Sequence, residues 1–288
     1  MKRIGILLAA LALASALSGA DWQEVGKTLG QEGKSLPGEV QKYSWPRSDL
    51  RVRVATVAVQ PALALGSWAA FRAEGSNAMT MGDLVLLEAE VNPVVRALQA
   101  GGFEVLAIHN HLLGETPHVL YVHFMGKGEP AALAKTLKDA LAKTKTPTQA
   151  AAPAHPTPAQ TKLLDELQTS LGKKGTMAGT VLQVGVPRAD PITDGGMEIP
   201  PSMGMAESIN VQTAGERVAA TGDFVLVADE VNPVIAELQS HGIEVTALHS
   251  HMLRETPRLF FMHFWGVGTP PRIGGGLKAA LSKVATKP

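Results

Sequence analysis

Histidine residues with the spacing of metal ligands occur twice in this sequence. Each set is a His-x-His pair followed by a glutamate and then a third histidine. The first set is His109, His111, Glu115 and His123, and the second is His249, His251, Glu255 and His263. Residues two apart on a strand project to one face, and a neighbouring strand brings further β-carbons within about 4.5–5.5 Å. Three imidazoles with an oxygen ligand or water are a common site for zinc and other divalent first-row metals.

A hairpin turning near Thr116 would place His123 opposite His109. We therefore predict one divalent metal site in each set, zinc first, with Glu115 and Glu255 as a fourth ligand, as residues that orient a ligand, or as general bases. If the site is catalytic, the expected chemistry is attack of a metal-activated water on a small substrate. Two alternatives stay open. One is metal capture or small-ligand sensing without catalysis, and the other is a structural histidine network between the two halves of the chain.

Other polar residues recur beside these sets. Glu90 and Glu230 each end a predicted strand before a helix, where they would orient the metal ligands or interact with the helix dipole. Asp83 and Asp223 each follow a glycine at the start of a predicted strand and are expected to be turn residues.

Two arginines, Arg47 and Arg188, each follow a proline and precede an aspartate by two residues. We expect local salt bridges with Asp49 and Asp190, and binding of an anionic ligand is the alternative.

Four methionines of the second repeat, two of them beside the second histidine set, offer soft sulfur ligands of the kind that copper uses. They are Met203, Met205, Met252 and Met262. Methionine more often fills a hydrophobic core, so copper ranks below zinc. The sequence contains no cysteine, which leaves nitrogen, oxygen and thioether sulfur as the available ligands and excludes disulfides and iron–sulfur clusters.

The histidine sets belong to a long internal repeat. Residues 82–130 align with residues 222–270 without a gap, and 26 of the 49 aligned positions are identical. Such similarity indicates two copies of one fold. Lys143 to Gln160 is rich in Thr, Ala, Gln and Pro and is typical of a linker. We predict a first repeat over residues 21–143, a linker over 144–160 and a second repeat over 161–288.

Each repeat has the pattern strand–helix–strand–strand–helix, with further strands upstream. In the first repeat we expect strands over 83–89, 103–112 and 118–125, a helix from Asn92-Pro93 to the glycines at 101–102, and a last helix carrying Leu133, Leu137 and Leu141. Gly274, Gly275 and Gly276 should delay the start of the last helix in the second repeat. The predicted fold class is α+β: two homologous, ferredoxin-like modules, each a mixed or antiparallel sheet with packed helices, related by a pseudo-twofold axis.

The N-terminus has the features of a signal peptide over residues 1–20. Lys2 and Arg3 precede an apolar run from Ile4 to Leu17, and Ser18-Gly19-Ala20 forms a small-residue cleavage site before Asp21. We predict export to the periplasm or the extracellular space, with no membrane span after cleavage, and a retained anchor as the alternative. Lys+Arg and Asp+Glu both number 26, which argues against a nucleic-acid partner.

The stretch A-I-H-N-H-L-L-x-E-x-P at 107–117 and P-R-L-F-F-M-H-F-W at 257–265 resemble the LppY/LpqO lipoprotein family, a bacterial domain family of unknown function. The G-D-[LF]-V-L and E-V-N-P-V segments, present in both repeats, fit the same pattern. The resemblance covers nearly the whole chain after residue 20 and implies an exported protein of two repeats. It supplies no assignment of catalytic residues. Unlike a lipoprotein, this chain has no cysteine that could carry a lipid.

Overall fold

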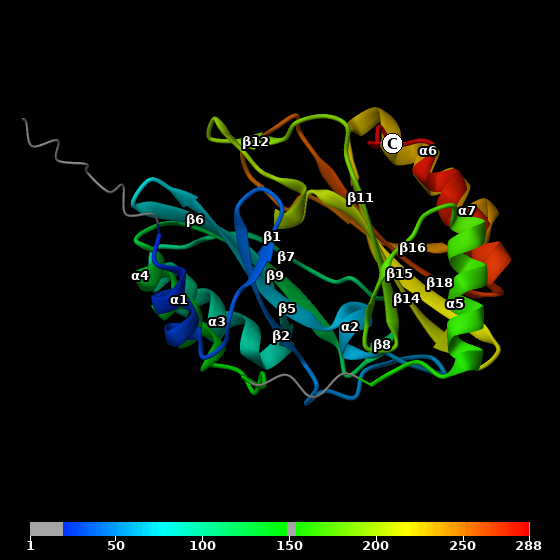
Figure 1. Cartoon of the computed structure of the whole chain (residues 1–288), viewed down its shortest axis with the longest axis horizontal. Helices are drawn as coiled ribbons and strands as arrows, with labels where there is room; N and C mark the ends of the chain where they lie inside the picture. Colours follow the sequence, from blue (N-terminus) through cyan, green and yellow to red (C-terminus); the bar gives the residue numbers. More distant parts are fainter. Residues whose placement is uncertain (1–19, 149–153, 288) are drawn as a thin grey trace, which may run out of the picture.

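The protein is described by a computed structural model covering residues 20–148 and 154–287 (Figure 1). The predicted signal peptide therefore lies outside the described residues, apart from Ala20. Within the described part of the chain, no helix has the length and apolar character needed to cross a membrane.

Both repeats build the same six-stranded sheet. The first has the order β1(Lys34–Leu36)–β2(Val40–Pro46)–β5(Gly66–Glu74)–β6(Asn77–Leu87)–β9(Val119–Gly128)–β7(Glu104–His109). The second has the order β10(Thr176–Ala178)–β11(Val181–Pro187)–β14(Ala206–Ala214)–β15(Arg217–Leu226)–β18(Phe260–Gly268)–β16(Glu244–His249). Neighbouring strands in both sheets are antiparallel. The prediction of a duplicated α+β fold is confirmed.

Three helices cover one face of each sheet. They are α1(Trp22–Leu29), α3(Glu88–Ala100) and α4(Pro130–Leu141) in the first repeat, and α5(Pro158–Leu171), α6(Ala228–Ser240) and α7(Pro270–Leu281) in the second. The two groups of helices lie at opposite ends of the molecule (Figure 1). Apolar side chains of each group pack with one face of its own sheet and form a separate hydrophobic core.

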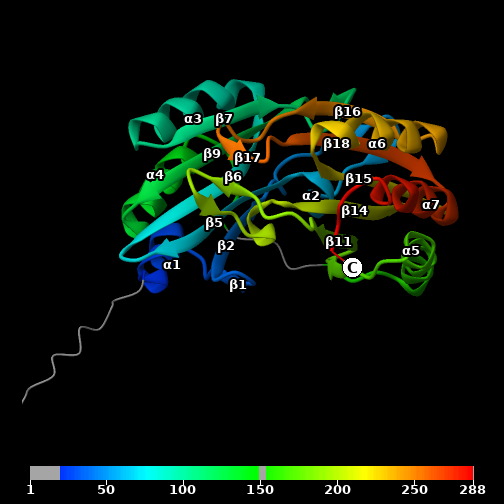
Figure 2. The ribbon, with the colours of Figure 1, turned by 90° about the horizontal axis from the view of Figure 1, so that it is seen from above.

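The opposite faces of the two sheets pack against each other, and Figure 2 shows the strands of both repeats overlapping in the middle of the molecule. Two further hydrophobic cores each contain side chains from both repeats. One combines Met81 and Met125 with Val225 and Phe261. The other combines Val85 and Tyr121 with Trp265. The repeats therefore share buried apolar surface, in addition to the core that each has for itself.

Small elements complete each repeat. A three-stranded sheet joins β3(Arg53–Val54), β4(Val57–Ala58) and β8(Glu115–Thr116), and its counterpart joins β12(Thr193–Asp194), β13(Met197–Glu198) and β17(Glu255–Thr256). A short helix α2(Pro61–Ala64) and a 3-10 turn η1(Pro201–Met203) occupy similar places in the two repeats. The strands β8 and β17 belong to the loop after each His-x-His pair. They pair with β3 and β12 and not with the six-stranded sheets.

The structure corrects three predicted element boundaries. Helix α3 begins at Glu88 rather than at Asn92, because the Glu90 carboxylate accepts the Leu87 amide at 2.9 Å and supplies the N-terminal hydrogen bond. Helix α7 begins at Pro270, with no delay at the glycines. A Cβ on Gly274 would lie 2.8 Å from the Leu167 carbonyl oxygen, so glycine there permits the close packing of α7 against α5.

Helix α5 begins at Pro158, so the last three residues of the predicted linker are helical. Thr157 caps this helix and forms a capping box with Gln160.

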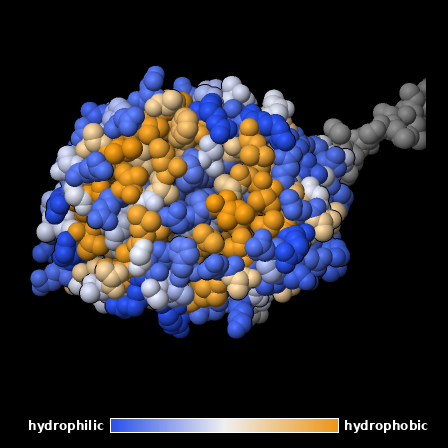
Figure 3. Space-filling view, turned by 180° about the vertical axis from the view of Figure 1, so that it is seen from behind, coloured by the Kyte–Doolittle hydropathy of each residue, from blue (hydrophilic) through white to orange (hydrophobic). Residues whose placement is uncertain are grey.

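The space-filling view from behind shows apolar side chains in patches separated by hydrophilic ones (Figure 3). Large apolar side chains that remain exposed include Ile108, Leu113, Leu248 and Leu253, which are two pairs at equivalent positions of the repeats.

Candidate metal centre

The first three histidines come from β7, β9 and the loop between β7 and β8. His109 ends β7, His111 lies two residues beyond it, and His123 lies within β9. The predicted pairing is wrong by two residues, because Tyr121 lies opposite His109 and His123 lies opposite Ala107. The hairpin is thus centred at Glu115 instead of Thr116, and a bulge between Val105 and Ala107 shifts the register only for the residues before Ala107.

His109 and His123 are therefore diagonal neighbours on one face, with ring centroids 4.9 Å apart. The centroid of His111 is 5.0 Å from that of His109. In the second repeat, the ring of His249 lies 4.7 Å from that of His251 and 5.0 Å from that of His263. Three imidazoles thus converge within each repeat. We call them the first trio (His109, His111 and His123) and the second trio (His249, His251 and His263).

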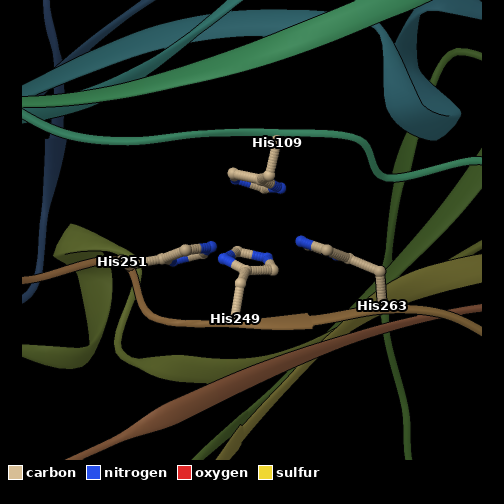
Figure 4. Close-up of side chains that lie close together, drawn as sticks. All are labelled: His109, His249, His251 and His263. Atoms are coloured by element: carbon tan, nitrogen blue, oxygen red, sulfur yellow. The ribbon is translucent and has the colours of Figure 1, made fainter.

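The two trios form one histidine cluster between the repeats. His109 stacks on His249 with centroids 3.6 Å apart. His111 stacks on His263, and His123 on His251, each pair at 3.7 Å. Each contact has its counterpart with the repeats exchanged, as a twofold relation requires. Figure 4 shows His109 and His249 facing each other from opposite strands, with His251 and His263 pointing their nitrogen ends toward the space between them.

All six Nε2 atoms of the histidine cluster are buried and have no hydrogen-bond partner among the described residues. An unsatisfied buried polar atom costs about 1–3 kcal/mol, so six in one place form an unfavourable arrangement for the protein alone. The Nδ1 atoms of His109, His249 and His263 lie 3.0–3.3 Å from the backbone oxygens of Asn110, Ser250 and Gly222. A carbonyl only accepts, so these Nδ1 atoms carry the hydrogen and each Nε2 presents a lone pair.

Two sets of nitrogen atoms are close enough together to hold a metal ion. One consists of His109, His249, His251 and His263, and the other is the first trio. The ligand atoms of each set lie within 4.8 Å of one another. His109 belongs to both sets, and one lone pair binds one ion. The cluster therefore suits a single shared centre better than the two separate sites that the sequence predicts.

The environment keeps the imidazoles neutral. Burial lowers the pKa of His109 to about 3 and that of His249 to about 4. Burial and the proximity of the other imidazoles hold the pKa of the remaining four well below the usual range. Neutral imidazole is the form that binds a metal.

Asp83 and Asp223, expected as turn residues, lie instead inside β6 and β15, where Asp83 pairs with His123 and Asp223 with His263. Asp83 places its carboxylate oxygens 3.8 Å from the Nε2 atoms of His111 and His123. Asp223 lies 3.8 Å from His251 Nε2 and from His263 Nδ1. The sequence signal for this role was present, since both aspartates recur at the same place in the repeat.

Glycines set the position of these aspartates. A Cβ on Gly82 would collide with the Trp68 carbonyl oxygen, and one on Gly222 with the Ser208 carbonyl oxygen. The close approach of the neighbouring strand therefore requires glycine immediately before each aspartate. Burial raises the pKa of Asp83 to about 8, with Lys42 opposing the shift, and raises the pKa of Asp223 well above its usual range. A divalent ion nearby would reverse this effect and favour the carboxylates.

Glu115 and Glu255 are bound elsewhere and belong to neither set of candidate ligands. Glu115 accepts a hydrogen bond from His118 at 2.6 Å, and one of its oxygens faces the Val119 amide at 3.4 Å. Glu255 accepts the Leu259 amide at 3.0 Å and pairs with Arg258 at 3.2 Å. Both glutamates thus form hydrogen bonds within the segment that joins the second histidine of each trio to the third.

Glu90 and Glu230 lie in a separate network around two buried arginines. Arg47 pairs with Glu90 at 2.7 Å and with Asp49 at 2.9 Å, and it donates to the Val85 carbonyl oxygen. Arg188 repeats these contacts with Glu230, Asp190 and Val225. The predicted local salt bridges are present, and the glutamates hold arginines rather than histidines.

The histidine cluster borders a cavity of about 630 Å³ between the two sheets. His111, His123, His251, His263, Asp83 and Asp223 are part of its lining. Met203 and Met205 also line it, while their side chains pack in a hydrophobic core together with Met252. Met262 packs in the core of the second repeat. These methionines act as core residues in this structure.

Comparison with known proteins places the chain in a family. A family model described as "Domain of Unknown Function (DUF1259)" matches residues 23–143 and again residues 165–283. The chain belongs to this family. Both matches coincide with the two repeats, and the narrower resemblance to the LppY/LpqO family stays a prediction.

None of the curated proteins compared matches the sequence. A solved structure, described as the crystal structure of a trimeric bacterial microcompartment shell protein PduB, is similar over 88% of this chain and 89% of that chain, with 10% sequence identity and a TM-score of 0.20. A likeness at that TM-score supports no conclusion about this protein.

Proposed function

We propose that this protein binds one divalent first-row transition metal ion, zinc first, in the histidine cluster between its two repeats. The observation that carries the proposal is the set of six buried Nε2 atoms that have no hydrogen-bond partner within residues 20–148 and 154–287. A metal ion would satisfy several of these lone pairs at once. Imidazole nitrogen suits zinc, copper, iron and nickel, and copper ranks below zinc because the nearby methionines pack in hydrophobic cores.

The four-histidine set gives the ion its main ligands. His109 reaches it from the first repeat, and His249, His251 and His263 reach it from the second. His111 and His123 would then complete the centre from the cavity side, beside Asp83. A centre made by both repeats explains why the duplicated chain keeps both trios: neither repeat alone provides the four-histidine set.

The cavity favours a centre that acts on, or senses, a small molecule. Structural zinc sites are closed by protein ligands, whereas catalytic sites keep an open position. Here four of the six imidazoles line a cavity large enough for a small ligand. If the centre is hydrolytic, Asp83 and Asp223 are better placed as proton acceptors than Glu115 and Glu255, because only the aspartates lie beside the imidazoles.

Metal analysis of the tag-free chain from Asp21 onward tests this proposal. We expect about one equivalent of zinc or another transition metal per chain. His109→Ala should lose it, since His109 belongs to both ligand sets. His155→Ala, in the linker, is the matched control and should keep the metal. A wild-type chain that remains metal-free after exposure to zinc, cobalt and nickel would make the histidines a structural network between the repeats.

We also propose that the protein is exported and that residues 1–20 are removed. Helix α1 begins at Trp22 with Asp21 as its N-terminal cap, so cleavage before Asp21 leaves every described element intact. Expression of the full chain in a Gram-negative host, followed by cell fractionation and N-terminal sequencing, checks this. We expect a periplasmic protein that starts at Asp21. A cytoplasmic protein that retains Met1 would contradict it.

A further inference from the structure

The wall of the cavity differs between the repeats, although the histidine cluster is shared almost equally by them. Lys34 and Lys42 line the cavity from the first repeat, and Thr176 and Gln183 line it from the second. The two pairs occupy the same place in the fold. Lys34 pairs with Lys42 across β1 and β2, and Thr176 pairs with Gln183 across β10 and β11. The first repeat therefore has two positive charges where the second has none.

Two lysines directly opposite each other are unfavourable in an antiparallel sheet, because like charges repel across the strands. At Lys42, burial lowers the pKa of the ammonium to about 8, and repulsion from Lys34 adds to this shift. The second repeat forms the same strand pair with two neutral residues at this position. The charges at Lys34 and Lys42 are thus not required by the fold.

Lys42 has no carboxylate partner within hydrogen-bonding distance in the described chain. Its Nζ lies 4.3 Å from the centroid of the Trp68 ring, which also lines the cavity. By contrast, Gln183 donates its amide to the Ala62 carbonyl oxygen at 3.1 Å. The neutral residue is therefore engaged by the protein, whereas the charged one presents its ammonium next to the cavity.

With a metal bound, the charges of the lining favour an anion. Its charged side chains are Lys34, Lys42, Asp83 and Asp223. Even with both aspartates ionised, two lysines and a divalent ion leave a net charge of two positive units. In a confined space of low dielectric constant, such an excess attracts a negative ligand strongly.

We propose that the cavity binds a small organic anion, with its negative group between Lys42 and the metal centre and its apolar part against Trp68. This inference rests on the proposed metal centre for one of the two anchors. Leu63, Leu106, Met203 and Met205 provide an apolar lining beside Trp68. The volume of about 630 Å³ lies within the range of about 300–1,000 Å³ that is usual for small-molecule sites. The negative group is a carboxylate or a phosphate, which share this chemistry.

Calorimetric titration of the zinc-loaded full chain tests the inference. Acetate, benzoate and inorganic phosphate are the probes, and neutral benzamide is the counterpart of benzoate. We expect at least one anion to bind, benzoate more tightly than benzamide. Lys42→Gln introduces the residue found in the second repeat. It should raise the Kd of that anion by about tenfold or more, the effect of losing one charge-assisted contact. Lys27→Gln, on the exposed surface of α1, is the matched control and should bind normally.

Metal content is measured on every sample, so the two proposals can fail separately. A chain that takes up no metal overturns the metal centre. A zinc-loaded chain that binds none of the three anions, or binds them equally well after Lys42→Gln, overturns the anion site. If Lys42→Gln proves unstable, Lys34→Thr removes the neighbouring charge instead and should weaken the same anion. Preference for phosphate over both carboxylates would identify the negative group as a phosphate.

Discussion

Two buried polar networks recur in both repeats, and they differ in how far the described residues satisfy them. Each arginine, Arg47 or Arg188, contacts two carboxylates and a backbone carbonyl of its own repeat. The histidine cluster has the opposite character. Its rings stack between the repeats, and its Nε2 atoms have no hydrogen-bond partner in the described part of the chain.

The difference separates a structural network from a candidate binding centre. Burial alone does not indicate function, since Arg47 and Arg188 are among the most buried side chains of the chain. A buried ion pair whose hydrogen bonds are nearly complete needs no ligand. All three guanidinium nitrogens of Arg47 are bonded, and among the described residues only the Nε of Arg188 lacks a partner in these two networks' guanidinium groups. A group of neutral, convergent nitrogen atoms without partners is complete only when something binds it. The predictions below test whether the two groups behave this differently.

The largest expected effect is on stability, from Arg47→Met. This substitution leaves the buried Glu90 carboxylate without its counter-ion, which typically lowers the free energy of unfolding by about 3–5 kcal/mol. Urea denaturation at a fixed zinc concentration measures the loss. Arg188→Met should cause a similar loss through Glu230. Zinc content of the folded variants should be unchanged, and a variant that folds normally but loses its metal would contradict the separation.

Metal removal should come next in size. A ligand that binds only the folded state stabilises it by about 2.7 kcal/mol at 100 times its Kd and about 4.1 kcal/mol at 1,000 times. We expect a chelator to lower the Tm of the wild type and to leave the Tm of His109→Ala unchanged. Because the centre joins the repeats, the wild-type shift should appear in the unfolding of both. An equal shift in the two proteins would show that the metal binds elsewhere.

A smaller effect on stability should depend on pH and should occur only in the arginine network of the second repeat, which contains Glu207. Glu207 is buried near Arg188, at the place of Ser67 in the first repeat, and burial raises its pKa well above the usual range. The folded state therefore holds a proton that the unfolded state releases, so stability is lost as pH rises above about 4.5. Glu207→Gln should stabilise the protein at pH 8 by about 1–3 kcal/mol and have little effect near pH 4. Ser67→Ala is the control and should show no such pH dependence.

The smallest effect is expected for Glu115→Gln. The amide oxygen of glutamine can still face Val119, and the pair with His118 is exposed on the histidine side. We expect the free energy of unfolding to fall by about 0.5–1.5 kcal/mol, the net contribution of one hydrogen bond, in thermal unfolding experiments. Zinc affinity, measured by competition with a chelator, should stay within about twofold of wild type. A large fall in affinity would return Glu115 to the metal centre, as the sequence alone suggests.

Local sequence determined much of this protein. The ungapped repeat indicates two copies of one fold. The apolar runs, together with the glycines at 101, 102 and 242, predict the order of strands and helices. The His-x-His spacing and the third histidine predict that each trio converges. These features depend on strand alternation and helix periodicity, which act over a few residues and can be read along the chain.

Tertiary structure decided how the trios are used. The turn of the hairpin is centred at Glu115, which places Tyr121 rather than His123 opposite His109. The strands β8 and β17 pair Glu115 and Glu255 with β3 and β12, away from the main sheets. Packing of the two sheets stacks each imidazole on one from the other repeat, and it brings Asp83 and Asp223 to the cluster from β6 and β15. No spacing within one repeat encodes a contact between repeats. The shared centre therefore exists only once apolar burial has brought the two sheets together.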